Sequence, residues 1–237
     1  MTPLVRAAAD LGVRIFEQSA VLDIEHGARP KVTTADGDIT ADAVLIAGNA
    51  YSRLEPALLS NVVFPAGSYI IATEPLSDGT ASEINSPDCA VCDLSEIVDY
   101  FRLSADRRLL YGGACSYSGR DPASIEAYIR PRMLKTYPQL KDIRIEYEWG
   151  GKIGIVLNRV VAVGRIQGNV YYCQGYSGHG VSASHLMGEV MADAVAGTME
   201  RYDLFADMKH FRIPGTRWMG NQLVALGMLY YRIKDLL

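Results

Sequence analysis

The chain has 237 residues, of which 49% are apolar, with 23 basic and 27 acidic side chains and a formal net charge of −4. This length suffices for one large domain or two modest ones, and the apolar share excludes a disordered chain. The acidic balance and the absence of basic blocks exclude an electrostatic footprint for nucleic acid. The charge-free apolar stretch at residues 218–231 is shorter than the roughly 20 residues of a spanning helix.

Four cysteines in a chain of this size are typical of a reducing compartment. The first residues lack the basic segment and apolar core of a signal peptide. Both features predict a cytoplasmic protein.

Residues 1–55 predict a helix, short strands and one buried strand. The helix spans residues 4–11 and ends at Gly12, and strands are expected over residues 13–16 and 21–26. Residues 31–34 and 38–40 flank a hairpin turn, and residues 43–47 form a continuous apolar run that suits a strand buried on both faces. Because a helix opens the chain with no strand before it, we expect this segment to be the later part of a βαβ unit whose first strand is missing.

Residues 56–160 predict a second domain with an antiparallel sheet. Strands are expected over residues 68–73, 100–103, 108–112, 143–147 and 153–157. A helix is expected to begin at Asp121 as N-cap, with Pro122 at its first position, and to end before Pro138. Residues 161–200 then add short strands near 160–163 and 170–173 and a helix over 180–196. Residues 201–237 form a tail with a final helix.

The sequence between Gly175 and Gly180, GYSGHG, lies between a predicted strand and a predicted helix. Free backbone N–H groups and the helix dipole at such a turn favour partial negative charge, and glycine allows close approach. The spacing from Gly178 to Ala183 also mimics a dinucleotide fingerprint, but the strand and acidic residue that this fingerprint requires do not follow. A cofactor or anion contact is the favoured interpretation, with a plain tight turn as the alternative.

Other candidates have weaker support from the residues alone. The loop at Gly48 follows the buried strand, where ligands bind in open α/β sheets. Tyr100 and Arg102 share one face of a strand, which suits an amine or carboxylate ligand or, alternatively, a solvated face. Cys89 and Cys92 are interpreted as two ordinary thiols, because no second pair accompanies them. No metal site is expected.

Taken together, the segments resemble the D-amino-acid-oxidase-like FAD-dependent oxidoreductases, the group that includes glycine and sarcosine oxidases. The matching pieces are ADAVLIAGNAYS (41–52), SYIIATEPL (68–76), DYFRLSADRRLLYGG (99–113), EWGGKIGIVLNR (148–159) and VGRIQGNVYYCQGYSGHGVSASHL (163–186). The resemblance implies an α/β (mixed α+β) fold, in which a three-layer FAD-binding domain carries an inserted antiparallel substrate domain. It also implies FAD as cofactor and a small amine as substrate.

The resemblance assigns roles to individual residues. The backbone of Val21 would lie on the adenine, and residues Tyr100 and Arg102 would belong to the sheet that roofs the substrate. The remaining cofactor contacts fall in three loops: Gly48, Asn49 and Ala50; Gly150 and Gly151; and Ser177, Gly178, His179, Gly180, Val181 and Ser182. No single catalytic residue is assigned, because hydride transfer from a neutral amine to the flavin requires no acid–base group.

Two hypotheses follow from this resemblance. In the first, the chain derives from an FAD amine oxidoreductase that transfers hydride to the flavin, which oxygen then reoxidises. In the second, the chain is a non-catalytic fragment that needs self-association or a complementing chain to finish the FAD site. The absence of an N-terminal G-x-G-x-x-G, which normally binds the pyrophosphate, motivates the second. A plain anion- or nucleotide-binding module is the third possibility.

Overall fold

The computed structural model describes residues 3–95, 97–215 and 217–234. Its helices are α1 (Pro3–Asp10), α2 (Pro56–Leu59), α3 (Asp78–Asn85), α4 (Ile125–Thr136), α5 (Gly180–Val195), α6 (Glu200–Ala206) and α7 (Arg217–Lys234), with short 3-10 turns η1 (Asn49–Tyr51) and η2 (Pro138–Leu140). Its strands are β1 (Val21–Glu25), β2 (Lys31–Thr34), β3 (Asp38–Thr40), β4 (Val44–Ile46), β5 (Phe64–Thr73), β6 (Val91–Cys92), β7 (Tyr100–Leu103), β8 (Leu109–Ser116), β9 (Ile145–Ile155), β10 (Ala162–Ile166) and β11 (Val170–Gln174). The mixed α/β fold expected from the sequence is confirmed.

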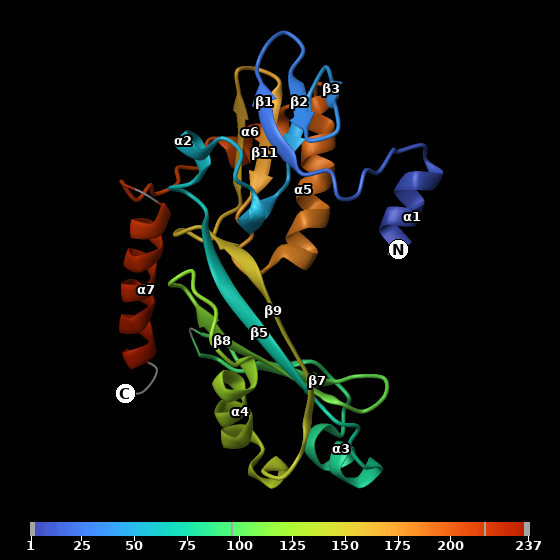
Figure 1. The fold of residues 1–237 in the computed structure, drawn as a ribbon, viewed down its shortest axis with the longest axis vertical. Helices are drawn as coiled ribbons and strands as arrows, with labels where there is room; N and C mark the ends of the chain where they lie inside the picture. The colour runs from blue at the N-terminus through green and yellow to red at the C-terminus, as the bar shows by residue number, and fades with distance from the viewer. Residues whose placement is uncertain (1–2, 96, 216, 235–237) are drawn as a thin grey trace.

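The upper part of the molecule in Figure 1 has three layers. Its middle layer is the sheet β10-β11-β4, in which β11 pairs antiparallel with β10 and parallel with β4. Tyr171 and Cys173 on one face of β11 pack under α5 and α6. Val170 on the other face packs against Ile24 of the β1-β2-β3 meander. Because side chains alternate along a strand, β11 contributes residues to two hydrophobic cores, one on each face of the sheet.

The lower part in Figure 1 is a five-stranded antiparallel sheet of order β6-β7-β8-β5-β9. Tyr69, Ile71 and Tyr111 lie on one face and pack against Ile129 and Met133 of α4, which are fully buried. Strands β5 and β9 are long, pair from Phe64↔Ile155 to Thr73↔Ile145, and connect this sheet to the upper part. Among the described residues, the opposite face is covered only at one end, where Val224 of α7 packs near Phe64.

Two predictions at the N-terminal end were wrong. Residues 13–16 form no strand, and Val13 and Phe16 are 55% and 59% exposed. No described strand lies beside this segment to share its backbone hydrogen bonds, and an isolated strand has no stability of its own. Strand β4 is buried on one face only, since Leu45 is 43% exposed. Among the described residues β4 pairs on one side alone, with β11, and is therefore an edge strand.

The two strands predicted over 143–147 and 153–157 are one continuous strand, β9. Gly150 and Gly151 lie in its middle, in register with Tyr69 and Ser68 of β5. Glycine favours turns by propensity, but an uninterrupted partner strand supplies hydrogen bonds throughout this segment and keeps it extended.

The N-cap of α4 is Ser124, not Asp121 as predicted. The Ser124 side chain accepts a hydrogen bond from the Ala127 amide. Asp121 instead accepts a hydrogen bond from the Tyr69 hydroxyl at 2.7 Å and pairs with Lys152, so it joins the segment before α4 to the sheet. The helices predicted over 4–11 and 180–196 and the final helix are confirmed, and no described helix is long and apolar enough to cross a membrane.

Replacing Ser124 by alanine will lower the free energy of unfolding by about 1 kcal/mol, because one N-terminal amide of α4 loses its acceptor. Ser86→Ala is the matched control, since Ser86 is exposed and caps no helix N-terminus. Urea denaturation measures both variants. Equal stability of the two would contradict the capping role of Ser124.

Candidate functional site

The candidate site is built where the η1 loop, the end of β9 and the glycine turn after β11 meet. The Asn49 side-chain Oδ1 accepts a hydrogen bond from the Gly175 amide at 2.9 Å. The Ser177 amide donates to the Gly154 carbonyl at 2.8 Å, and the Ser177 Oγ accepts from the Val156 amide at 3.1 Å. Three segments far apart in the chain are thereby held by hydrogen bonds among half-buried Asn49 and the buried groups of Gly154, Val156, Gly175 and Ser177.

Backbone conformation explains the residue types at this junction. Asn49 has a φ of 47°, a left-handed conformation that asparagine tolerates better than most residues. Gly154 is required by close packing, because a Cβ there would lie 2.3 Å from the Asn49 Oδ1. Gly175 and Gly178 have φ values of 83° and 97°, which favour glycine. The glycine turn is thus fixed in shape rather than being a free loop.

The start of α5 offers unpaired backbone donors. The amides of Gly180, Val181 and Ser182 make no hydrogen bond with described residues, and no acidic side chain lies in the first turn. Val181 is 87% exposed, and Gly178 has open space around its Cα. This end of α5 can therefore accept a negatively polarised group that also covers apolar surface.

The other predicted cofactor residues lie around the same junction or beside it. Val21 and Gly48 line one cavity of about 590 Å³ between β1 and β4. Gly151 faces Tyr51 of η1, whose hydroxyl accepts a hydrogen bond from the Lys152 amide at 2.7 Å. Gly150, by contrast, makes room for the Tyr69 ring, since a Cβ there would lie 2.5 Å from that ring.

Ser177 and Ala50 have internal roles in the structure. Ser177 is 3% exposed and its hydroxyl is used within the junction, while Ala50 is 5% exposed. His179 is exposed and precedes α5 as its N-cap residue without a side-chain capping bond. Within the turn, the positions left accessible are therefore Gly178, His179 and the first residues of α5.

Tyr100 and Arg102 lie on the uncovered end of the five-stranded sheet. One row across this face contains Tyr100, Gly112, Ile70 and Trp149, and the next contains Arg102, Leu110, Ala72 and Tyr147. The Tyr100 hydroxyl lies 3.0 Å from the Ser68 Oγ, and burial raises its pKa, so the phenol stays protonated at neutral pH. Arg102 is exposed, and its Nε donates to the Leu103 carbonyl.

Sequence reasoning missed the aromatic part of this face. Tyr147 is 57% and Trp149 43% exposed, beside the predicted Tyr100 and Arg102. The sequence did contain the signal for this aromatic face, because alternate residues of a strand share one face and residues 147, 149 and 151 alternate. Splitting β9 into two strands concealed it.

The four cysteines are free thiols. Cys89 and Cys92 are exposed, whereas Cys173 is buried in the upper part of the molecule. Burial raises the pKa of Cys115 and of Cys173, which disfavours the thiolate of each. The described residues contain no group of three side chains suited to a metal ion.

Replacing Asn49 by alanine will destabilise the junction by about 1–3 kcal/mol, because the buried Gly175 amide loses its acceptor. Asn49→Asp is the conservative variant, since it retains an acceptor and tolerates the left-handed conformation. Chemical denaturation gives the free energies of unfolding. If the alanine and aspartate variants were equally stable, the hydrogen bond to Gly175 would not be the stabilising contact.

Comparisons with known proteins identify the family. The family model described as FAD dependent oxidoreductase matches residues 1–194. The chain is 42% identical over 226 residues to gamma-glutamylputrescine oxidoreductase of Escherichia coli (strain K12), covering 94% of this chain and 53% of that protein. It is 38% identical to a probable oxidoreductase, OrdL, of Haemophilus influenzae, and the match covers 98% of this chain and 54% of that protein. The chain therefore spans about half the length of these relatives.

Solved structures show the same fold at lower sequence identity. Glycine oxidase of Geobacillus kaustophilus superposes with a TM-score of 0.69 at 20% identity, covering 88% of this chain and 56% of that one. L-Proline dehydrogenase of P. horikoshii gives a TM-score of 0.65, also at 20% identity, and the match covers 83% of this chain and 56% of that one. Given the family match over most of its length, this chain belongs to the FAD-dependent oxidoreductases of the D-amino-acid-oxidase type.

Proposed function

We propose that this chain carries one part of the FAD site and the substrate-binding sheet of an amine oxidoreductase, with a small amine such as γ-glutamylputrescine as substrate. The observation that carries this proposal is the fixed glycine turn with its free α5 amides, set beside an aromatic sheet face. The 42% identical relative is named for γ-glutamylputrescine, which motivates the choice of amine.

A flavin fits the residues present at the junction. The unpaired amides of Gly180 to Ser182 and the exposed Val181 suit a planar group whose edge is negatively polarised. FAD, when bound, supplies the acceptor for the two electrons that leave the substrate. The α5 N-terminus would stabilise the negative charge that the cofactor gains on reduction.

The protein's own contribution to the reaction is positioning. The amine loses a hydride from its α-carbon and a proton from its nitrogen, and water then hydrolyses the imine to an aldehyde and ammonia. Tyr147 and Trp149 provide an apolar wall for the carbon chain, and Arg102 provides a cation for a carboxylate at the far end of the substrate. Oxygen is the proposed final electron acceptor.

The cofactor site is proposed to require a further polypeptide segment, in the same chain or in a second one. Strand β4 has one unpaired edge among the described residues, and Leu45 and Leu22 beside it are 43% and 63% exposed. An exposed apolar edge of this kind favours pairing with another strand. Self-association through this edge is the alternative source of the missing partner.

The first experiment is an absorption spectrum of the purified chain with FAD, before and after removal of excess cofactor. The same measurement is made on the chain joined to the segment of the E. coli relative that the match does not span. We expect bound flavin in the joined protein at one per chain, and amine-dependent bleaching of its colour. A well-folded, colourless joined protein would contradict the proposed cofactor.

Replacing Ser182 by aspartate in the joined protein will lower the midpoint potential of its flavin, because a carboxylate at the start of α5 repels the charge gained on reduction. The same change will leave the melting temperature equal or higher, since an acidic residue in the first turn stabilises a helix. Ser182→Ala is the control. An unchanged potential for the aspartate variant would place the flavin away from α5.

Replacing Arg102 by alanine will raise the KM for a carboxylate-bearing amine by roughly tenfold, which corresponds to about 1.4 kcal/mol of lost binding. The value of kcat and the KM for an amine without a carboxylate will change little. Arg6→Ala, an exposed arginine on α1, is the control. Steady-state kinetics of both substrates test the role, and an equal loss for the two substrates would refute it.

A further inference from the structure

Helix α7 turns an apolar face to solvent. Six of its large apolar side chains are between 47% and 66% exposed: Trp218, Met219, Leu223, Leu226, Leu229 and Tyr230. Most of them recur three or four residues apart, so they share one face of the helix, which we call its outer face. Figure 1 shows α7 along one flank of the molecule, with no described element on its outer side. A contiguous exposed apolar surface of this kind marks a site of interaction.

The opposite face of α7 fixes the orientation of the helix. Gly220 lies against β5, because a Cβ at this position would overlap the Phe64 ring. Asn221 is 6% exposed, and its Nδ2 donates a hydrogen bond to the Pro65 carbonyl at 3.4 Å. Val224 is buried against the same strand. A rotation that buried the outer face would expose Val224 and break these contacts, so the apolar face stays at the surface.

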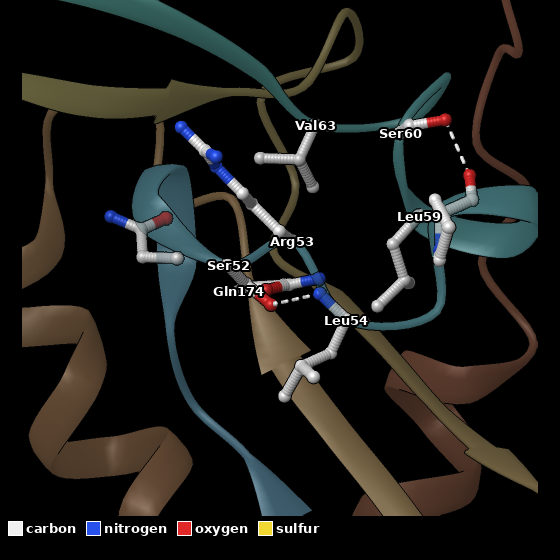
Figure 2. Close-up of a pocket in the computed structure, with 9 residues that line it drawn as sticks. Ser52, Arg53, Leu54, Leu59, Ser60, Val63 and Gln174 are labelled. Carbon is white, nitrogen blue, oxygen red and sulfur yellow. Dashed lines mark hydrogen bonds between the residues drawn. The ribbon is translucent and has the colours of Figure 1, made fainter. Parts of the chain in front are cut away.

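The segment that leads into α7 is also held in place. The Arg212 Nη1 donates to the Leu58 carbonyl at 3.2 Å, and the Ile213 amide donates to the Asn61 carbonyl at 3.2 Å. These acceptors lie in α2 and just after it. Leu59 of α2 is 5% exposed, and Figure 2 shows its side chain pointing into the cavity beside this helix. Helix α7 is therefore anchored at its N-terminal end and along its inner face.

The charge of this part of the chain restricts what can cover the outer face. Residues 208–234 contain no acidic side chain, although the net charge of the whole chain is −4. Their five lysines and arginines are Lys209, Arg212, Arg217, Arg232 and Lys234. A second copy would bring the same positive charge to the contact, and like charges disfavour such pairing. An anionic lipid surface complements both the charge and the apolar face.

We propose that the outer face of α7 binds the surface of an anionic lipid bilayer, with the helix axis in the plane of that surface. Trp218 and Tyr230 lie near the two ends of the face, and aromatic side chains of this kind favour the headgroup boundary. Leu226, between them, enters the adjoining acyl region, and the basic residues pair with lipid phosphates. None of these residues belongs to the proposed cofactor or substrate surface, so the inference does not depend on the proposed function.

The first test is flotation of the full chain with vesicles through a density gradient, which separates bound protein from aggregates. Vesicles of equal parts of phosphatidylglycerol and phosphatidylcholine are compared with vesicles of phosphatidylcholine alone. We expect binding to the anionic vesicles to be at least about tenfold tighter and to weaken as salt is added, because the cations approach a charged surface. Equal binding to both vesicles, or no binding to the anionic vesicles at low salt, would overturn the proposal.

Tryptophan fluorescence locates the contact. The chain contains two tryptophans, and Trp149→Phe leaves Trp218 as the reporter. We expect its emission to move to shorter wavelength when anionic vesicles are added, because an indole that enters the boundary loses water. In the reciprocal variant, Trp218→Phe, the emission of Trp149 is expected to stay unchanged. A shift of Trp149 alone would place the lipid contact on the sheet face and refute the assignment to α7.

Two matched pairs of substitutions test the apolar and the charged contributions. Leu226→Ser is expected to weaken binding about tenfold, whereas Leu4→Ser, at an equally exposed leucine of α1, is expected to leave it unchanged. Lys209→Gln is expected to weaken binding about fivefold, and Lys135→Gln, on the exposed side of α4, is expected to leave it unchanged. Equal binding of the Leu226→Ser and Leu4→Ser variants would exclude α7 from the contact.

Two further measurements distinguish the other possible occupants of the outer face. The chain joined to the unmatched segment of the E. coli relative is expected to float with anionic vesicles as the chain does, and loss of binding on joining would show that this segment covers α7. Sedimentation over a range of protein concentrations is expected to give no dimer that depends on Leu226. A dimer that Leu226→Ser dissociates would show that a second copy covers the face. Either contrary result would overturn the proposal.

Discussion

The structure depends on one junction, in which hydrogen bonds from Asn49 and Ser177 hold the η1 loop, β9 and the glycine turn together. Each bond satisfies a buried backbone group, for which an unmade bond is costly. They fix where the three-layer part meets the long strands of the antiparallel sheet. The direction of α5, and so the position of its free N-terminal amides, follows from this junction.

The junction also separates two kinds of surface that serve different chemistry. The start of α5 provides backbone dipoles and no acidic side chain, which suits the negatively polarised edge of a cofactor. The uncovered sheet face provides Tyr147, Trp149 and Arg102, which suit the carbon chain and the charge of a substrate. Because β5 and β9 join the two parts in a continuous ladder, the distance between these surfaces is set by strand geometry rather than by a flexible linker.

Stability and binding place opposing demands on several positions. Within the part of the chain that the structure describes, the Gln174 Oε1 has no hydrogen-bond partner, β4 pairs along one edge alone, and the first amides of α5 have no acceptor. Each of these features costs stability in isolation, and the costs at β4 and α5 are offset when another strand or a ligand supplies the partner. The three positions lie around the ends of β4 and β11, where ligands bind in α/β sheets.

The sequence by itself determined most element types, the hairpins and the glycine turn before α5, because periodicity, turn residues and local motifs are short-range signals. The family followed from the resemblance of its segments to known proteins. Tertiary structure decided the features that depend on strands or side chains distant in the sequence. The segment 13–16 has no neighbouring strand and stays irregular, β9 continues through two glycines because β5 pairs along it, and Asp121 binds Tyr69 and Lys152 instead of capping α4. Likewise, Ser177 holds the junction from inside, and the Gln174 Oε1 is buried without a partner among the described residues, because only packing decides which polar groups lose water.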